Sequence, residues 1–547
     1  MTVSNPTSRN TLSEILLLLG LFVAALGTRY PYLWVVPRFR DETFNALRSL
    51  QIYRGELFPL TDVELYMGSF FNYAVTAGFY VSGPSIYTAR LVVTLFGAAT
   101  VVATYLLGRQ VGGRVVGLIA AGLMVTNGIH IAAMGHVGFS ANIAPFFSTV
   151  GFWLLHRAAT LRSGRSLAGA GFAFGMALHT HPITVGYLPG AALWVLATGR
   201  HLLKSKALIA AALLFLFAYL PMIAYNVQTA GGSVAHALYT ASERPDYARN
   251  RPTALTPRVY LDRMGDYGWM IYQTAGGSLD GRGGLALPAW DPTLLLVNVL
   301  CAAGVLWAAL RGYSLALIVA ATFSVILPIF NAAHYDVVGD GRYFALALPL
   351  VYASLGMLVR DVTVGIVSRG WAPRAFAVGA ASLIVAVIIL APISSLVRYY
   401  GRTAGAEPTN ASLIRAMDRL VASREQGQTV ILDENLNDRR VANASPWDEA
   451  STFRIFRFIM EFEAIPYRVI DLDETSLARL AADGRPYIVI LGSGRDSVET
   501  ANLGRLLQQF NMQGLDGATG RPPRPADRYG MYRLDPAQAL PAGNPRA

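Results

Sequence analysis

The chain has 547 residues, of which 53% are hydrophobic and only 14% are charged, with a formal net charge of +11. Soluble domains carry nearer a quarter of charged residues, so this composition excludes an ordinary soluble protein and indicates a chain that crosses a membrane several times. The positive charge lies in the apolar part of the chain, where it marks cytoplasmic loops, and does not indicate nucleic-acid binding. The single cysteine, Cys301, excludes an intrachain disulfide and a multi-cysteine metal site.

The first apolar run, Ile15–Thr28, resembles a signal peptide in position. No clear small-residue cleavage site follows it, so we expect it to be retained as the first span. Further apolar runs of helical length bring the expectation to about eleven spans. They lie at 12–30, 88–108, 115–133, 139–156, 167–181, 183–199, 206–228, 291–310, 313–332, 343–360 and 374–397.

Basic residues gather in alternate loops between these runs. With a cytoplasmic N-terminus they all fall on the inner side, which is the distribution typical of membrane proteins. We therefore expect a multi-pass protein of the cell inner (plasma) membrane, with loops 31–87, 229–290 and 333–342 and the C-terminal tail on the outer face. The basic residues concerned are Arg109, Arg114, Arg157, Arg162, Arg165, Arg200, Lys204, Lys206, Arg311, Arg360, Arg369 and Arg374.

Two apolar segments are too short to be ordinary spans. Residues 66–82 contain Asn72 and several Gly and Ser, and we interpret them as a re-entrant or interfacial helix. The run 167–181 ends in His179-Thr-His181-Pro182. Because broken helices at membrane depth need protein or water around them, this segment indicates a cavity.

The chain changes character near residue 400. Short β-rich runs at 429–432, 467–470 and 487–491 alternate with expected helices at 411–424, 447–462, 474–482 and 496–509. This alternation predicts a small α/β domain with a parallel sheet, followed by a loose segment from Pro522. We therefore divide the chain into a membrane domain (1–400) and an extracytoplasmic α/β domain (401–547).

Acidic residues show where chemistry is most plausible. Residues 65–242 contain no Asp and no Glu, and the pair Asp41-Glu42 lies just upstream in the first outer loop. Residues 41–54 fit an amphipathic helix on the bilayer surface, with Phe44, Leu47, Leu50 and Tyr53 on one face. The pair at its start is either a simple helix N-terminus or a reactive carboxylate at the lipid–water boundary.

The order of these features resembles the GT-C glycosyltransferases, in particular bacterial relatives of the protein mannosyltransferases and of the aminoarabinose transferase. One span precedes an outer loop with an Asp-Glu pair and a surface helix, and many spans and a soluble domain follow. Further similarities are Pro84-x-x-Tyr87-x-x-Arg90-Leu91, the Gly108-Arg109 and Gly112-Gly113-Arg114 turn, and Gly341-Arg342-Tyr343 leading into Leu348-Pro349-Leu350. The resemblance covers about residues 12–400.

The resemblance implies an enzyme that moves a sugar from a polyprenyl-phosphate donor to a protein, lipid or polysaccharide acceptor on the outer face. In such enzymes an Asp of the first outer loop acts as the base, which implies that role for Asp41, with Glu42 in support. A leaving phosphate needs cationic donors, and Arg342, Arg38 and Arg40 are the arginines that we expect to bind it. Pairing of Arg342 with Asp336 or Asp340 is the alternative.

Metal dependence stays open at this point. The family commonly has an acidic or basic residue in the loop that here contains His136, and this chain has no acid there. His136 and His334 are candidates for substrate phosphate or for a metal ligand, although an interfacial histidine is more often a hydrogen-bonded wall residue. If Mg²⁺ or Mn²⁺ is bound, Asp41 is the expected ligand.

Two other functions compete with the transferase. A transporter of a lipid-linked substrate should carry ionisable residues near the bilayer midplane and paired repeats, whereas the carboxylates here collect at one face. A catalytically inactive scaffold subunit of the same fold is compatible with the missing second acid.

Overall fold

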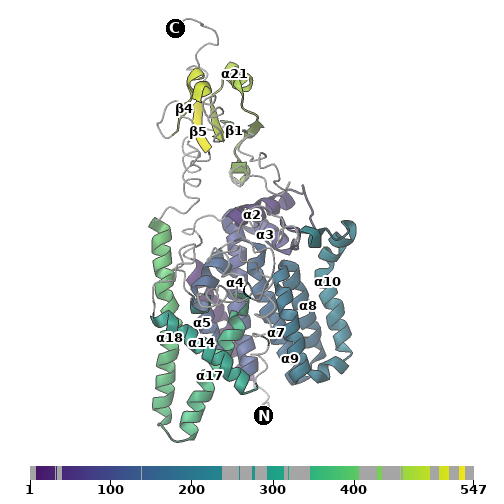
Figure 1. The fold of residues 1–547 in the computed structure, drawn as a ribbon, viewed down its shortest axis with the longest axis vertical. Coiled ribbons are helices and arrows are strands. Elements are labelled where there is room, and N and C mark those ends of the chain that lie inside the picture. The colour runs from purple at the N-terminus through teal and green to yellow at the C-terminus, as the bar shows by residue number, and fades with distance from the viewer. Residues whose placement is uncertain are drawn as a thin grey trace. The chain divides into compact units, whose positions relative to one another are not determined.

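The computed structural model is built mainly of helices (Figure 1), and it describes residues 8–30, 33, 40–136, 138–236, 258, 274–277, 292–312, 318, 345–405, 425, 428–433, 456–457, 460–462, 464–492, 504–515 and 529–535. Its α-helices are α1 (Ser8–Arg29), α2 (Arg40–Tyr53), α3 (Phe70–Ser82), α4 (Ile86–Gly112), α5 (Arg114–Thr126), α6 (Gly128–His136), α7 (Ala144–Leu161), α8 (Gly164–Thr180), α9 (Tyr187–Thr198), α10 (Ala207–Gln228), α14 (Pro292–Leu310), α17 (Leu348–Ser368), α18 (Arg374–Gly405) and α21 (Glu474–Ala482). Short 3-10 helices are η2 (Ser140–Ile143), η3 (Pro182–Gly186), η4 (Arg200–Lys204) and η5 (Ala345–Ala347).

The chain forms two compact units. One contains Met1–Val36 and Arg48–Ala406, and the other contains Pro37–Leu47 and Glu407–Ala547. The helix α2 therefore contributes its first two turns to the unit of the C-terminal domain and its last turns to the helical unit.

Five of the described helices are long and apolar enough to cross a membrane: Thr11–Arg29, Tyr87–Gly112, Ala207–Gln228, Ala345–Ser368 and Arg374–Val397. Shorter apolar helices are Arg114–Thr126, Pro182–Thr198 and Leu294–Leu310. Every span predicted from the sequence coincides with helical residues, except 313–332, which lies outside the described residues apart from Ile318. The structure thus confirms a polytopic helical protein.

The predicted span 115–133 is not one continuous helix, because it is broken between α5 and α6 at Asn127. The Asn127 side chain explains the break. Its amide donates to the Thr274 carbonyl and to the Tyr352 hydroxyl, both at 2.7 Å, and its oxygen accepts from the His130 backbone N–H at 2.7 Å. The bond to His130 satisfies one of the N–H groups that the start of α6 leaves without an intrahelical partner, and the other two tie the break to distant segments.

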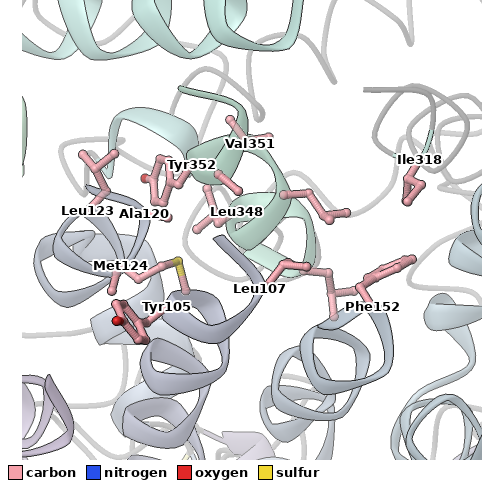
Figure 2. Close-up of a cluster of buried hydrophobic side chains, with 14 of the residues drawn as sticks. Tyr105, Leu107, Ala120, Leu123, Met124, Phe152, Ile318, Leu348, Val351 and Tyr352 are labelled. Carbon is pink, nitrogen blue, oxygen red and sulfur yellow. The ribbon is translucent and has the colours of Figure 1, made fainter. Parts of the chain in front are cut away.

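The apolar core of the helical unit joins α4, α5, α7 and α17. Figure 2 shows Tyr105 of α4 near Met124 of α5, Leu107 of α4 on the side of Phe152 of α7, and Tyr352 of α17 near Ala120 and Leu123 of α5. Each of these side chains is buried. In a chain surrounded by lipid this close packing, rather than removal from water, holds the helices together.

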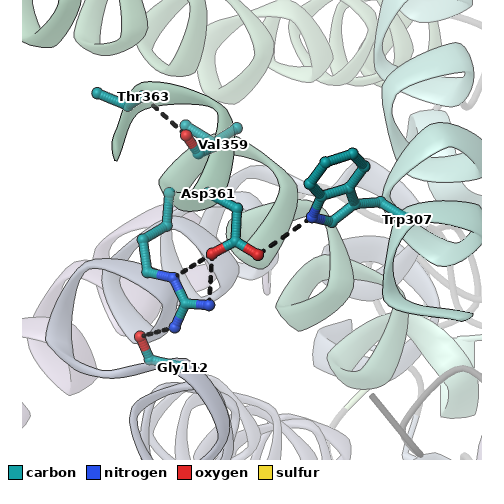
Figure 3. A network of polar contacts seen from close by, with 6 residues as sticks. Gly112, Trp307, Val359, Asp361 and Thr363 are labelled. Atoms are coloured by element: carbon teal, nitrogen blue, oxygen red, sulfur yellow. Dashed lines mark hydrogen bonds and ion pairs between the residues drawn. The ribbon is translucent and has the colours of Figure 1, made fainter. Parts of the chain in front are cut away.

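A polar network ties α17 to the end of α4 (Figure 3). Arg360 donates through Nη1 to the Gly112 carbonyl at 2.9 Å and through Nε to Asp361 at 2.7 Å. Asp361 also accepts from the Trp307 indole N–H of α14 at 3.1 Å. Because Gly112 is the last residue of α4, the arginine caps a carbonyl that has no intrahelical donor.

Glycines allow α8 and α10 to lie side by side, as Figure 1 shows. A Cβ on Gly171 would come within 2.0 Å of the Ala211 carbonyl oxygen, and one on Gly175 within 2.4 Å of the Phe215 carbonyl oxygen. The two glycines are one turn apart and form the small-residue face that close membrane helix pairs require.

The C-terminal unit contains a sheet with strand order β2-β1-β3-β5-β4. The strands β1 (Val430–Asp433), β2 (Tyr467–Ile470) and β3 (Tyr487–Gly492) pair in parallel, as expected. The strand β5 (Tyr529–Leu534) pairs antiparallel with β3 and with β4 (Gln513–Gly514). The prediction of a loose segment from Pro522 was therefore wrong for β5, whose Met531 and Leu534 are buried. The expected helix 474–482 is α21, whereas 411–424 lies outside the described residues.

Candidate functional site

The predicted pair Asp41-Glu42 lies in the first turn of α2. Glu42, Asn45 and Ser49 are all buried, at 0%, 1% and 0% relative exposure. Their spacing of three and four residues places them on one face of the helix, so α2 turns a polar stripe inward. The predicted helix is confirmed. The sequence pattern had emphasised its apolar face, of which Leu50 is buried and Phe44, Leu47 and Tyr53 are half-buried.

The loop between α2 and α3 folds into a short hairpin, which we call the 61–68 hairpin. Thr61 and Gly68 form a β-bridge, and the Asp62 backbone N–H donates to the Met67 carbonyl at 2.8 Å. The Met67 N–H in turn donates to the Glu64 carbonyl at 2.9 Å. These bonds place Asp62 at the base of the hairpin and Glu64 and Tyr66 near its tip.

Asp62 is fully buried at the base of the hairpin. Its Oδ1 accepts from the Val63 backbone N–H at 2.6 Å and from the Asn72 side-chain amide of α3 at 3.2 Å. Burial raises the pKa of the Asp62 carboxyl to about 6, while the neighbouring Ser140 hydroxyl, the Val63 N–H and the Arg48 charge limit the rise. Asp62 therefore keeps its proton to a higher pH than an exposed aspartate does.

The tip of the hairpin contacts residues distant in the sequence. Glu64 Oε2 lies 3.0 Å from His236 Nε2, at hydrogen-bond distance. Tyr66 stacks on His236, with ring centroids 5.7 Å apart, and meets His181 edge-on at 6.2 Å. The hairpin thus joins the residues after α10 to the junction of α8 and η3.

The end of α8 supports the same hairpin. Gly68 donates its N–H to the His179 carbonyl at 2.7 Å, and Phe70 donates its N–H to His179 Nε2 at 3.2 Å. A Cβ on Gly68 would lie 2.2 Å from His179 Nε2, so only glycine fits against this ring. The helix stops at Thr180 and η3 begins at Pro182, which confirms the break predicted at the His-Thr-His-Pro segment.

Two buried arginines lie at helix ends in the helical unit. Arg29, at the end of α1, bonds through Nη2 to His130 Nδ1 at 2.7 Å. Arg90, near the start of α4, donates to the Leu33 carbonyl at 2.7 Å. Both side chains are almost fully buried, at 0% and 1% exposure. Their hydrogen bonds therefore link segments inside the helical unit, and the two arginines are not solvated surface charges.

Several predicted site residues cannot be placed against this cluster. Arg38, His334 and Arg342 lie outside the described residues, whereas Arg40 begins α2 and His136 ends α6. The part of the chain that the structure describes contains no group of three or more His, Cys, Asp or Glu side chains suited to a metal ion. The roles predicted for these five residues therefore stay predictions.

The sequence reasoning missed Asp62 and Glu64. The signal was present, because they are the last two carboxylates before the acid-free stretch 65–242. The structure brings three histidines together around the hairpin: His179, His181 and His236.

The sequence and the fold are both similar to known proteins. Residues 68–225 match the family described as dolichyl-phosphate-mannose-protein mannosyltransferase. The structure is similar to that of ArnT from Cupriavidus metallidurans in the apo state, with a TM-score of 0.58 and 12% identity, covering 97% of this chain and 100% of that chain. The chain has the GT-C glycosyltransferase fold.

Two further solved structures share the GT-C fold. ArnT from Cupriavidus metallidurans bound to undecaprenyl phosphate matches with a TM-score of 0.54 and 13% identity, covering 98% of this chain and 100% of that chain. The Archaeoglobus fulgidus oligosaccharyltransferase tethered to an acceptor peptide containing the NVT sequon matches with a TM-score of 0.50 and 14% identity, covering 96% of this chain and 74% of that chain. No curated protein sequence gives a significant match. The fold expected from the sequence is confirmed, and this GT-C chain is a multi-pass membrane protein.

Proposed function

We propose that the protein transfers a sugar from a polyprenyl-phosphate donor to an acceptor on the extracytoplasmic face of the inner membrane. The family match over residues 68–225 and the GT-C fold support a transferase. The similar ArnT structure contains undecaprenyl phosphate, and the similar oligosaccharyltransferase structure contains an acceptor peptide. A donor with a long isoprenoid tail stays in the bilayer, so the reaction must take place at the membrane surface.

The observation that carries this proposal is the acidic start of α2, which lies shortly before a long apolar stretch without acids. Glu42 is fully buried next to Asp41. Asp and Glu are then absent from residues 65–242. An acidic pair at the edge of this acid-free stretch, where a lipid-linked donor would meet water, supports a chemical role for Asp41 and Glu42.

In the proposed reaction Asp41 is the general base, supported by Glu42. The acceptor atom attacks the anomeric carbon while the bond from that carbon to the phosphate oxygen breaks. The bonding electrons leave with the polyprenyl phosphate, and Asp41 takes the acceptor proton. Attack opposite to the leaving phosphate inverts the anomeric centre.

Cationic and histidine side chains are proposed to stabilise the leaving phosphate. Arg342, Arg38 and Arg40 are assigned this role because the guanidinium group suits phosphate oxygens, and His136 and His334 are assigned as further substrate contacts. Asp41 is the proposed ligand if Mg²⁺ or Mn²⁺ takes part.

Comparing cells with and without the gene tests this function. Mass spectrometry of their glycolipids, surface polysaccharides and surface glycoproteins should show one hexose or pentose missing from one class of product when the gene is deleted. A polyprenyl-phosphate sugar should accumulate at the same time. Unchanged products together with an unchanged pool of lipid-linked sugar would exclude the transferase.

A further inference from the structure

Two buried oxygen atoms in the 61–68 hairpin are left without hydrogen-bond partners among the described residues. They are Asp62 Oδ2 and Asn72 Oδ1. The same two side chains are already joined by one hydrogen bond, from the Asn72 amide nitrogen to Asp62 Oδ1 at 3.2 Å. Both residues are 0% exposed, so bulk water does not satisfy these oxygens. A buried acceptor without a donor is costly, and the paired arrangement needs an explanation.

A single proton on the Asp62 carboxyl group would give both oxygen atoms a hydrogen-bond partner. A proton on Asp62 Oδ2 donates to Asn72 Oδ1, while the Asn72 amide continues to donate to Asp62 Oδ1. The carboxylic acid and the carboxamide then form a closed ring of two hydrogen bonds. We propose that Asp62 carries a proton and forms an acid–amide pair with Asn72, which locks the 61–68 hairpin to α3 at mildly acidic pH and releases it when the proton is lost.

The charged and titratable groups around Asp62 fit a neutral acid. Arg48 on α2 acts on the carboxyl as a distant charge, and it favours ionisation less than burial opposes it. Glu64 on the same hairpin opposes ionisation. His179 on α8 accepts the Phe70 N–H at Nε2, so its proton is on Nδ1 and the ring is neutral in this arrangement.

The ionised state has a different hydrogen bond available. Ser140 of η2 donates to the Met67 sulfur at 3.5 Å, and its hydroxyl also lies near enough to the Asp62 carboxyl to lower its pKa. Rotation of this hydroxyl gives the carboxylate a donor after the acid–amide ring opens. The hairpin therefore has two alternative polar arrangements, selected by one proton.

The lock has a consequence at the tip of the hairpin. The Asp62 N–H holds the Met67 carbonyl, and the turn between them carries Glu64 and Tyr66. Glu64 pairs with His236 and Tyr66 stacks on it. Loss of the acid–amide pair removes the hydrogen bonds that hold the base of this turn to α3. The contact of the hairpin tip with His236 should then loosen. The inference concerns the hairpin alone and does not depend on the proposed transfer reaction.

The conservative variant Asp62→Asn tests the proton directly. Its amide nitrogen donates to Asn72 Oδ1 and its oxygen accepts from the Asn72 amide, so it reproduces both hydrogen bonds of the protonated acid without a titratable group. Hydrogen–deuterium exchange of residues 61–68, corrected for intrinsic exchange, should increase in the native protein as pH rises from 5 to 8. Over this pH range the increase should be about 10-fold, because a carboxyl with a pKa of about 6 is already about one-tenth ionised at pH 5. In Asp62→Asn the protection should stay at its acidic value.

The control is Glu56→Gln, which neutralises a carboxylate in the same loop that is 51% exposed and pairs with Arg54 at 3.8 Å. This variant should keep the native pH response. Equal pH responses in the native protein and in Asp62→Asn would overturn the proposal. So would protection that follows added or chelated cations rather than pH, because a bound cation would then neutralise the carboxylate.

Infrared difference spectra decide the matter if Asp62→Asn does not fold. The native protein should show the C=O stretch of a protonated carboxyl that disappears with a midpoint near pH 6. In Asn72→Leu, which removes the amide and keeps Asp62, this band should move to higher frequency because its hydrogen bonds are lost. A band at the same frequency in Asn72→Leu, or no such band in the native protein, would contradict the acid–amide pair.

Discussion

At the scale of single residues, Asp62 shows most clearly how burial acts on a carboxyl group. It is fully buried, and its Oδ2 has no hydrogen-bond partner among the described residues. Burial is the main cause of its raised pKa, and the sign of that shift fixes how pH acts on stability.

The folded state holds the Asp62 proton more tightly than the unfolded chain, because its pKa rises from 3.8 to about 6. The stabilisation is therefore complete below about pH 4 and is lost as pH rises through about 6. The full shift corresponds to about 3 kcal/mol of unfolding free energy. Thermal unfolding in detergent at a series of pH values should show this loss in the native protein and a flatter profile in Asp62→Asn.

Residue-level prediction from the sequence was only partly successful. Asp41 and Glu42 were chosen for their position, and the structure adds that Glu42 is buried. Asp62 and Glu64 were overlooked, because their position before the acid-free stretch does not show that the hairpin and Ser140 enclose Asp62. The contact between Glu64 and His236 joins residues 172 positions apart, which no local pattern reveals.

At the scale of secondary-structure elements, apolar length predicted most helices correctly. The helix α3 has 13 residues and a length of about 20 Å, which is shorter than the hydrocarbon core. This agrees with the interpretation of residues 66–82 as something other than a full span. The break at Asn127 was missed because the residues on both sides are apolar, and only the side-chain contacts with Thr274 and Tyr352 show why the helix stops.

The contact between α8 and α10 gives a prediction at this scale. In Gly171→Ala the new Cβ would meet the backbone oxygen of Ala211, which cannot rotate away. We expect a loss of about 1–3 kcal/mol of stability, as for other overpacked interiors. The control Gly365→Ala places its Cβ in open space on α17 and should be neutral or slightly stabilising. A melting temperature for Gly171→Ala equal to that of the native protein would show that the two helices are not so closely packed.

At the scale of the whole molecule, composition predicted a polytopic membrane protein, and the resemblance of the segment order to GT-C glycosyltransferases predicted the fold. The sequence did not predict that Pro37–Leu47 group with the C-terminal unit, since that grouping depends on contacts between distant segments. Strand β5 was missed because only pairing with β3 makes its alternation recognisable.

Orientation in the membrane is a prediction of this account. Phe58 is 72% exposed in the loop expected outside, and Ser368 is exposed in a loop expected inside. In cells, Phe58→Cys should react with a membrane-impermeant maleimide, whereas Ser368→Cys should react only after permeabilisation. The natural Cys301 is buried and should give little background. The reverse pattern would place the acidic start of α2 on the cytoplasmic side and contradict the proposed site.

The most direct test of the central claim uses purified protein in lipid vesicles with a radiolabelled polyprenyl-phosphate sugar and the acceptor identified from the gene-deletion comparison. The native protein should release polyprenyl phosphate and label the acceptor. Asp41→Asn, with unchanged expression and melting temperature, should abolish both. Near-normal turnover by Asp41→Asn would contradict the assignment of Asp41 as the base, and no turnover by the native protein would contradict the transferase itself.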